Sequence, residues 1–161
     1  MIFSTITSSN ILKNQVNQDS KFRTFTPQNP SKMNKDYSRS THISFQVRQD
    51  ECDFRHRLTV SSLVGYLQEA AWLASVESGY SIPELMEAHS ITWLLSRFVL
   101  YLEKYPNFGD EVKIETYASK VDKFYTQRDF QVFVNGERVA TAVSLWLLVN
   151  VNDKKLTRGA E

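Results

Sequence analysis

The chain has 161 residues, with 19 Lys and Arg against 18 Asp and Glu, which gives a formal net charge of +1. This balance argues against a general nucleic-acid binder, because such proteins need a basic face to neutralise phosphates. Hydrophobic residues make up 42% of the chain, enough for one domain with a real core. No apolar run approaches the roughly 20 residues of a membrane-spanning helix. The single cysteine, Cys52, excludes an internal disulfide.

Residues 1–40 are predicted to be a disordered N-terminal arm. They are rich in Ser, Thr, Asn, Gln and Lys, and Asp19 and Asp36 are their only acids. Their apolar residues are too scattered to offset the entropy of ordering the segment. Two alternatives stay open: a Ser-rich, acid-poor organelle transit peptide, or a true start at Met33. We expect a cytoplasmic protein, or a plastid protein if the arm is a transit peptide.

The domain is predicted to span residues 41–158 and to begin with a strand and a long helix. Residues 42–48 alternate between apolar and polar side chains, which is typical of a strand. After a polar run over residues 49–57, apolar residues recur at three- and four-residue steps from Val60 to Ala74. This spacing predicts an amphipathic helix, capped at its start by Thr59 and stopped by Gly79. A short second helical turn is expected over residues 83–88.

The remainder of the domain reads as strands. Residues 91–102 are apolar on both faces, which predicts a central strand covered on both sides. Strict alternation there puts Trp93 and Leu95 on one face and Phe98 on the other. Residues 112–118 alternate as a half-exposed strand, and two further strands, 124–134 and 138–151, flank Asn135-Gly136. That dipeptide predicts a type I′ hairpin turn.

This order of elements predicts the α+β class. One long helix can cover only one face of a sheet, so a curved antiparallel sheet wrapped around that helix satisfies the pattern. This is the arrangement of the hotdog fold. A second copy or a second domain is then expected to close the exposed edge of the sheet.

Several segments resemble the N-terminal hotdog domain of the acyl-carrier-protein (acyl-ACP) thioesterase family. The resemblance covers residues 43–158 in the right order, and its motifs are Leu67-Gln68-Glu69-Ala70-Ala71, Gly79-Tyr80-Ser81, Ile91-Thr92-Trp93-Leu94-Leu95-Ser96-Arg97, Tyr105-Pro106-Asn107-Phe108-Gly109-Asp110 and Gln127-Arg128-Asp129-Phe130. Phe108 stands where the family has Trp in its Tyr-Pro-x-Trp-Gly-Asp turn.

The resemblance implies hydrolysis of the thioester that joins a fatty acyl chain to the phosphopantetheine arm of acyl carrier protein, without a cofactor or metal. Such enzymes have two hotdog domains, of which the first shapes the acyl pocket and the second supplies the catalytic residues. This sequence ends at Glu161, with residues 159–161 at the expected start of a linker. No segment matches the catalytic stretch, so no residue of a second domain is carried over.

Three functions therefore stay open. The first is the acyl-pocket domain of an acyl-ACP thioesterase that binds acyl carrier protein and a second hotdog domain. The second is a single-domain hotdog acyl-CoA thioesterase that acts as a homodimer. The third is a non-catalytic acyl-binding or pairing half.

Candidate catalytic residues lie in the polar run and on the long helix. Asp53 and His56 resemble the Asp-x-x-Gly-His-like segment that some single-domain hotdog thioesterases carry before the central helix, although Arg55 replaces the Gly. Glu69 occupies a helix position where other hotdog enzymes place an acid. Each also has a simple structural interpretation, as an exposed loop residue or an exposed helix residue.

Candidate substrate-binding residues lie on the helix and on the strands. Those expected to wall an acyl pocket are Val64, Leu67, Trp93, Leu95 and Phe98. Arg97 stands in an apolar strand, where a buried guanidinium needs a carboxylate or carbonyl partner. We expect it either to serve the fold or the pairing of domains, or to touch the pantetheine or substrate head. The same alternatives hold for Arg128, paired with Asp129 or Asp110.

Overall fold

The computed structural model describes residues 40–158, so the predicted arm over residues 1–39 and the expected linker start over 159–161 lie outside the described residues. The elements are β1 (Thr41–Gln46), a 3-10 turn η3 (Gln49–Glu51), α2 (Val60–Glu77), α3 (Ile82–His89), β2 (Ile91–Leu102), β3 (Glu111–Val121), β4 (Tyr125–Val134) and β5 (Glu137–Asn150). This is the predicted order of one strand, a long helix, a short helix and four strands.

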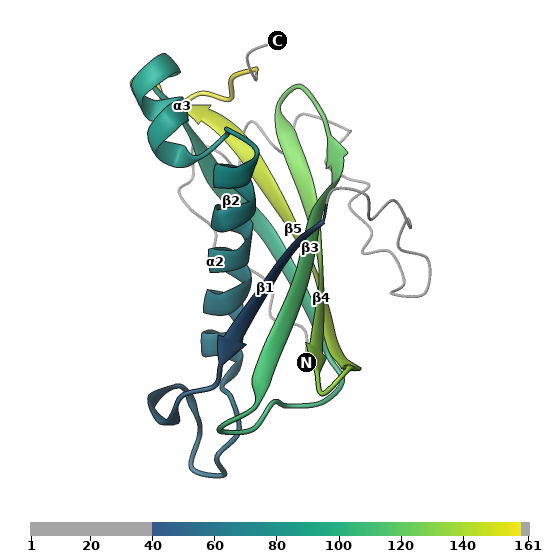
Figure 1. Cartoon of the computed structure of the whole chain (residues 1–161). Helices are drawn as coiled ribbons and strands as arrows, with labels where there is room; N and C mark the ends of the chain where they lie inside the picture. Colours follow the sequence, from purple (N-terminus) through teal and green to yellow (C-terminus); the bar gives the residue numbers. More distant parts are fainter. Residues whose placement is uncertain (1–39, 159–161) are drawn as a thin grey trace.

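The five strands form one antiparallel sheet in the order β1-β3-β4-β5-β2. Figure 1 shows α2 lying along one face of this sheet, with α3 at its C-terminal end. We call the face that packs on α2 the inner face. The predicted class, α+β with a curved antiparallel sheet around one long helix, is confirmed.

The prediction that residues 91–102 form a central strand is wrong, because β2 is an edge strand that pairs with β5 alone among the described strands. Most of its side chains are half-buried. In β2, apolar residues on both faces therefore do not indicate that the strand has a neighbouring strand on each side. Within the described residues, the free edge of β2 leaves a twelve-residue, mostly apolar strand available for pairing with another chain or domain.

A register shift in β2 explains why strict alternation assigned its faces wrongly. The pairing with β5 slips between Leu95 and Arg97, which is the signature of a bulge. Leu95 lies opposite Trp146, whereas Phe98 lies opposite Ser144, and residues 144 and 146 of β5 share a face. Trp93, Leu95 and Phe98 therefore all belong to the inner face.

Helix α2 starts and packs as its sequence predicts. Thr59 is the N-cap, and its hydroxyl accepts a hydrogen bond from the amide of Ser62. The buried residues of α2 recur at helical spacing and are Leu63, Tyr66, Leu67, Ala70, Ala71 and Ala74. The remaining side chains of α2 are exposed or half-buried, and that of Trp72 is 42% exposed.

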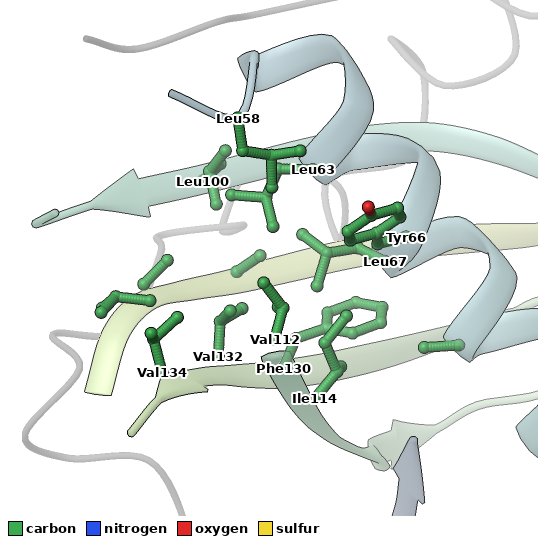
Figure 2. Close-up of a cluster of buried hydrophobic side chains, with 14 of the residues drawn as sticks. Leu58, Leu63, Tyr66, Leu67, Leu100, Val112, Ile114, Phe130, Val132 and Val134 are labelled. Atoms are coloured by element: carbon green, nitrogen blue, oxygen red, sulfur yellow. The ribbon is translucent and has the colours of Figure 1, made fainter. Parts of the chain in front are cut away.

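The main core lies between the N-terminal half of α2 and the inner face of the sheet. Figure 2 shows Leu63 and Leu67 pointing from the helix toward Ile114, Phe130 and Val132 on the strands. Leu67, Phe130, Val132 and Ile114 have no exposed surface. At β1, the ring of Phe45 stacks on Tyr66 with centroids 4.5 Å apart, which closes this side of the core. This packing fixes the position of α2 over the sheet.

The hairpin between β4 and β5 has the predicted turn. Asn135 and Gly136 have φ values of 52° and 79°, so both are left-handed, as a type I′ turn requires.

Candidate functional site

A cleft of about 1310 Å³ lies between the C-terminal half of α2, α3 and the adjoining part of the sheet. Its walls come from α2 from Gln68 onward, from the loop that leads into α3, from α3 itself, and from residues of all five strands. The cleft exists because the helix side chains here are short: Ala71 and Ala74 occupy positions that face the sheet. Large residues fill the space under the N-terminal half of α2, and small residues leave it open farther along.

Helix α3 forms one wall of the cleft and is firmly attached. Leu85 packs with Ile91 and Leu148 in a second hydrophobic cluster, and Trp93 packs against this cluster. The indole N–H of Trp93 donates to the carbonyl of Tyr80 at 3.0 Å, which ties β2 to the loop before α3. Glu84 and Ser81 form a capping box at the start of α3. These contacts hold the wall in place without filling the cleft.

Arg128 lies in the cleft on the inner face of β4. Its guanidinium donates to the hydroxyl of Thr116 at 3.3 Å, and this hydroxyl in turn donates to the carbonyl of Asp129. Burial lowers the pKa of Arg128 to about 10, so the side chain remains a cation at neutral pH. The cleft therefore contains a positioned, partly desolvated positive charge among mostly apolar walls.

The mouth of the cleft carries further charges. Lys123 and Arg158 line it beside Asp122, and Glu84 lines the α3 side. The Arg158 guanidinium sits 5.8 Å from the ring centroid of Phe124. The hydrogen bond from the Ser81 hydroxyl lowers the pKa of Glu84, which keeps it ionised. Within residues 40–158, the Lys and Arg residues that line the cleft, Arg128 included, outnumber the Asp and Glu residues by three to two.

The predicted binding residues divide between the cleft and the core. Trp93 and Arg128 line the cleft. Leu67 is fully buried in the main core, and Val64 and Phe98 pack against that core. Leu95 is half-buried on the inner face of β2, opposite Trp146. The role of each residue in substrate binding stays a prediction.

Arg97 differs from its expected environment. It was expected to be a buried guanidinium, but the structure exposes it. The bulge in β2 places Arg97 opposite Leu145, on the face of the sheet that points away from α2. An exposed Arg retains its hydration, so burial does not force it to find a carboxylate partner.

The predicted catalytic residues do not meet at the cleft. Asp53 and His56 lie in the loop before the N-terminus of α2, whereas the cleft lies at the other end of this 18-residue helix. Asp53 accepts hydrogen bonds from the amides of Arg55 and Arg57 and from the Arg57 guanidinium. The backbone hydrogen bond from Arg57 is the main cause that lowers the pKa of Asp53.

This bonding gives Asp53 a structural task, which is to close the loop. His56 is exposed and left-handed, with φ of 58°, whereas Arg55, which stands in the place of the Gly of the resembling segment, does not have a positive φ. Glu69 is exposed on α2. Among residues 40–158 the three side chains do not form one constellation, and their catalytic roles stay predictions.

Sequence reasoning missed several residues of the cleft. Ala71, Ala74, Tyr80 and Trp146 line it, yet none was a candidate. The signal was present in Ala70, Ala71 and Ala74, because three alanines on the buried side of a helix leave room that larger residues would fill.

The family model of the acyl-ACP thioesterase N-terminal domain matches residues 38–161. The chain is similar to the chloroplastic palmitoyl-acyl carrier protein thioesterase of Arabidopsis thaliana, with 27% identity over 123 residues. That match covers 71% of this chain and 30% of the relative, so the chain spans less than a third of that protein.

Solved structures share the fold. The crystal structure of an acyl-ACP thioesterase from Bacteroides thetaiotaomicron superposes with a TM-score of 0.72 and 27% identity, over 76% of this chain and 50% of that one. A DHNA-CoA thioesterase from Staphylococcus aureus superposes with a TM-score of 0.69 and 17% identity, over 74% of this chain and 80% of that one. The hotdog fold expected from the sequence is confirmed.

Proposed function

Because the chain belongs to the acyl-ACP thioesterase family and carries the N-terminal domain of that family, we propose that its cleft binds the acyl chain of an acyl-ACP during thioester hydrolysis. The observation that carries this proposal is the cleft itself. It lies between the helix and the sheet, has a volume of about 1310 Å³, and remains open because Ala71 and Ala74 are small. An elongated, mostly apolar ligand fits such a site.

The catalytic groups in this proposal come from a second hotdog unit. Among the described residues that line the cleft, no acid forms a hydrogen bond with a histidine. Glu84 instead accepts hydrogen bonds from the amide and the hydroxyl of Ser81. The edge of β2 is the place where a second unit can add its own strand, because β2 is long, mostly apolar and, within residues 40–158, paired on one side only. That unit is a second domain or a second copy of this chain.

Acyl carrier protein is the proposed donor of the acyl chain. Lys123 and Arg158 at the mouth of the cleft can attract an acidic carrier and its phosphopantetheine phosphate. The names of the relatives, which act on acyl carrier protein, support this assignment. A plastid location, the alternative to the cytoplasm, is supported by the chloroplastic names of the same relatives. No helix within residues 40–158 is long and apolar enough to cross a membrane.

Two measurements test the proposal. In the first, the purified chain is titrated with decanoyl-pantetheine and with free pantetheine, and we expect binding of the first alone. In the second, the chain is incubated with acyl-loaded carrier protein, with and without the second hotdog domain of a full-length relative, and released fatty acid is counted. If the second unit is a second domain, hydrolysis is expected only when that domain is present; if it is a second copy of this chain, the chain alone hydrolyses the thioester. Failure of the chain to bind any acyl ligand would refute the proposal.

A single-domain acyl-CoA thioesterase is the second candidate. The observation that favours it is that this chain superposes on 80% of the Staphylococcus aureus thioesterase, so one such fold makes up most of that protein. Under this alternative the chain alone hydrolyses acyl-CoA as a dimer, and Asp53→Asn or Glu69→Gln abolishes the activity. Full activity in both variants would remove these residues from consideration.

A further inference from the structure

The position of Arg128 is unusual for a cleft that holds an alkyl chain. Its neighbours on the adjoining strands are the small residues Ala118 and Ser144, so little side-chain bulk separates the guanidinium from the cleft. Among residues 40–158 its guanidinium donates to the Thr116 hydroxyl, and no carboxylate lies within ion-pair distance. The acids that line the cleft have other partners: Glu84 accepts a hydrogen bond from the Ser81 hydroxyl, and Asp122 accepts one from the amide of Lys123.

A plain alkyl chain that covers the Arg128 guanidinium would displace the water around it, and the chain has no acceptor to replace the hydrogen bonds that the guanidinium makes to water. A guanidinium has five N–H donors, and covering them with hydrocarbon carries a large desolvation penalty. An oxygen atom in the ligand removes this penalty, because a hydrogen bond to a charged group is stronger than one between neutral groups. The position of Arg128 thus disfavours a plain alkyl chain and favours an aliphatic chain that carries an oxygen atom.

We propose that Arg128 is a binding residue for an acceptor oxygen, so that the cleft prefers an aliphatic chain that carries a carboxylate or another oxygen substituent over a plain alkyl chain. This inference rests on the proposed acyl-binding function and adds the chemical class of the ligand. Thr116 is the positioning residue, because its hydroxyl accepts from the guanidinium while donating to the carbonyl of Asp129.

Two ligand sources carry this chemistry. The first is the carboxylate of a released fatty acid, in which case Arg128 binds the product. The second is an oxygen substituent on the acyl chain itself, in which case Arg128 selects the substrate. The test must separate these two sources and must not depend on hydrolysis.

The experiment measures Kd by calorimetry for the purified chain with five ligands of equal chain length. These are decanoate, decan-1-ol, and the pantetheine thioesters of decanoic acid without a hydroxyl, with one on the third carbon and with one on the last carbon. The variants are Arg128→Met and Arg128→Gln, with Arg128→Lys to retain the charge. Arg138→Met is the matched control, because Arg138 lies on β5 outside the cleft and pairs with Glu103 at 3.6 Å.

If Arg128 binds the carboxylate of a released fatty acid, the wild type should bind decanoate at least about tenfold more tightly than decan-1-ol. A chain oxygen predicts the same preference for a hydroxylated thioester over the plain one. In either case both neutral variants lose the preference, Arg128→Lys keeps part of it and Arg138→Met keeps all of it. Circular dichroism confirms that each variant is folded.

Absence of both preferences in the wild type would overturn the inference without any variant. Retention of the preference in a folded neutral variant would overturn it as well. In either case, binding of the plain thioester would leave the acyl-binding function standing. If no ligand of the series binds, the proposed function fails and the role of Arg128 fails with it.

Discussion

Filling the cleft from α2 should shorten the acyl chain that the protein accepts. Ala74 is 3% exposed, faces the sheet and lines the cleft. The substitution Ala74→Leu adds three carbon atoms at this position. If these displace two methylene groups of the ligand, the loss is about 1.6 kcal/mol, at about 0.8 kcal/mol for each buried methylene. This corresponds to about fifteenfold in Kd.

The assay is a Kd series for saturated fatty acids of increasing length. For the wild type, affinity should rise with each added carbon until the cleft is full, and for Ala74→Leu it should level off about two carbons earlier. Val76→Leu is the control, because Val76 is 43% exposed on the solvent side of α2. Equal weakening of short and long chains by Ala74→Leu, or no change at all, would refute the reasoning.

Three further predictions concern stability and are measured by urea unfolding. Leu67→Ala removes a fully buried core side chain and should cost about 2–5 kcal/mol, whereas Val76→Ala at an exposed site should cost far less; similar costs would place the core elsewhere. Gly136→Ala should destabilise by about 1–2 kcal/mol because φ is positive there. Gly65→Ala in α2, where a Cβ meets nothing within 4 Å, should stabilise the protein by about 0.5–1 kcal/mol. A stability change of the same sign for Gly136→Ala and Gly65→Ala would contradict the turn assignment. Burial raises the pKa of Asp129 above its ordinary value of 3.8. The folded state then favours the neutral acid, so its contribution to stability is lost as pH rises through the folded pKa. Asp129→Asn should therefore become more stable relative to wild type as pH rises from 3 to 7, and a constant difference would contradict this.

The helix and the hairpin were predictable because local chemistry determines them. Thr59 caps α2 through its own hydroxyl, and Asn135 and Gly136 adopt left-handed conformations that few other pairs adopt. Neither feature depends on distant parts of the chain. Their boundaries therefore agree with the structure to within a residue or two.

The faces of β2 were not predictable from alternation. The bulge between Leu95 and Arg97 moves Trp93 and Leu95 to the inner face, and no local residue pattern marks it. The place of β2 at the edge of the sheet depends on pairing with β5, which is distant in sequence. Pairing with a strand that is distant in sequence therefore explains why β2 was predicted to be a central strand and why its faces were assigned wrongly. The same pairing places Arg97 on the exposed face.

The candidate site was predictable in part. Trp93 and Arg128 were candidates and line the cleft, but Ala71, Ala74 and Tyr80 were not. A search for large apolar residues finds the residues that fill a core, and Leu67 is one of them. A cavity is made by small residues, so the alanines of α2 were the more informative signal.

The proposed acyl-binding function depends most directly on where the acyl chain lies in the protein. A decanoyl-pantetheine with a spin label on the last carbon can be added to isotope-labelled protein, and broadening of each amide resonance measured by NMR. We predict the strongest broadening at Ala71, Ala74 and Trp146, with little effect at Asp53. Broadening confined to the face of the sheet that carries Val143 and Leu145, with the cleft residues unaffected, would contradict the account.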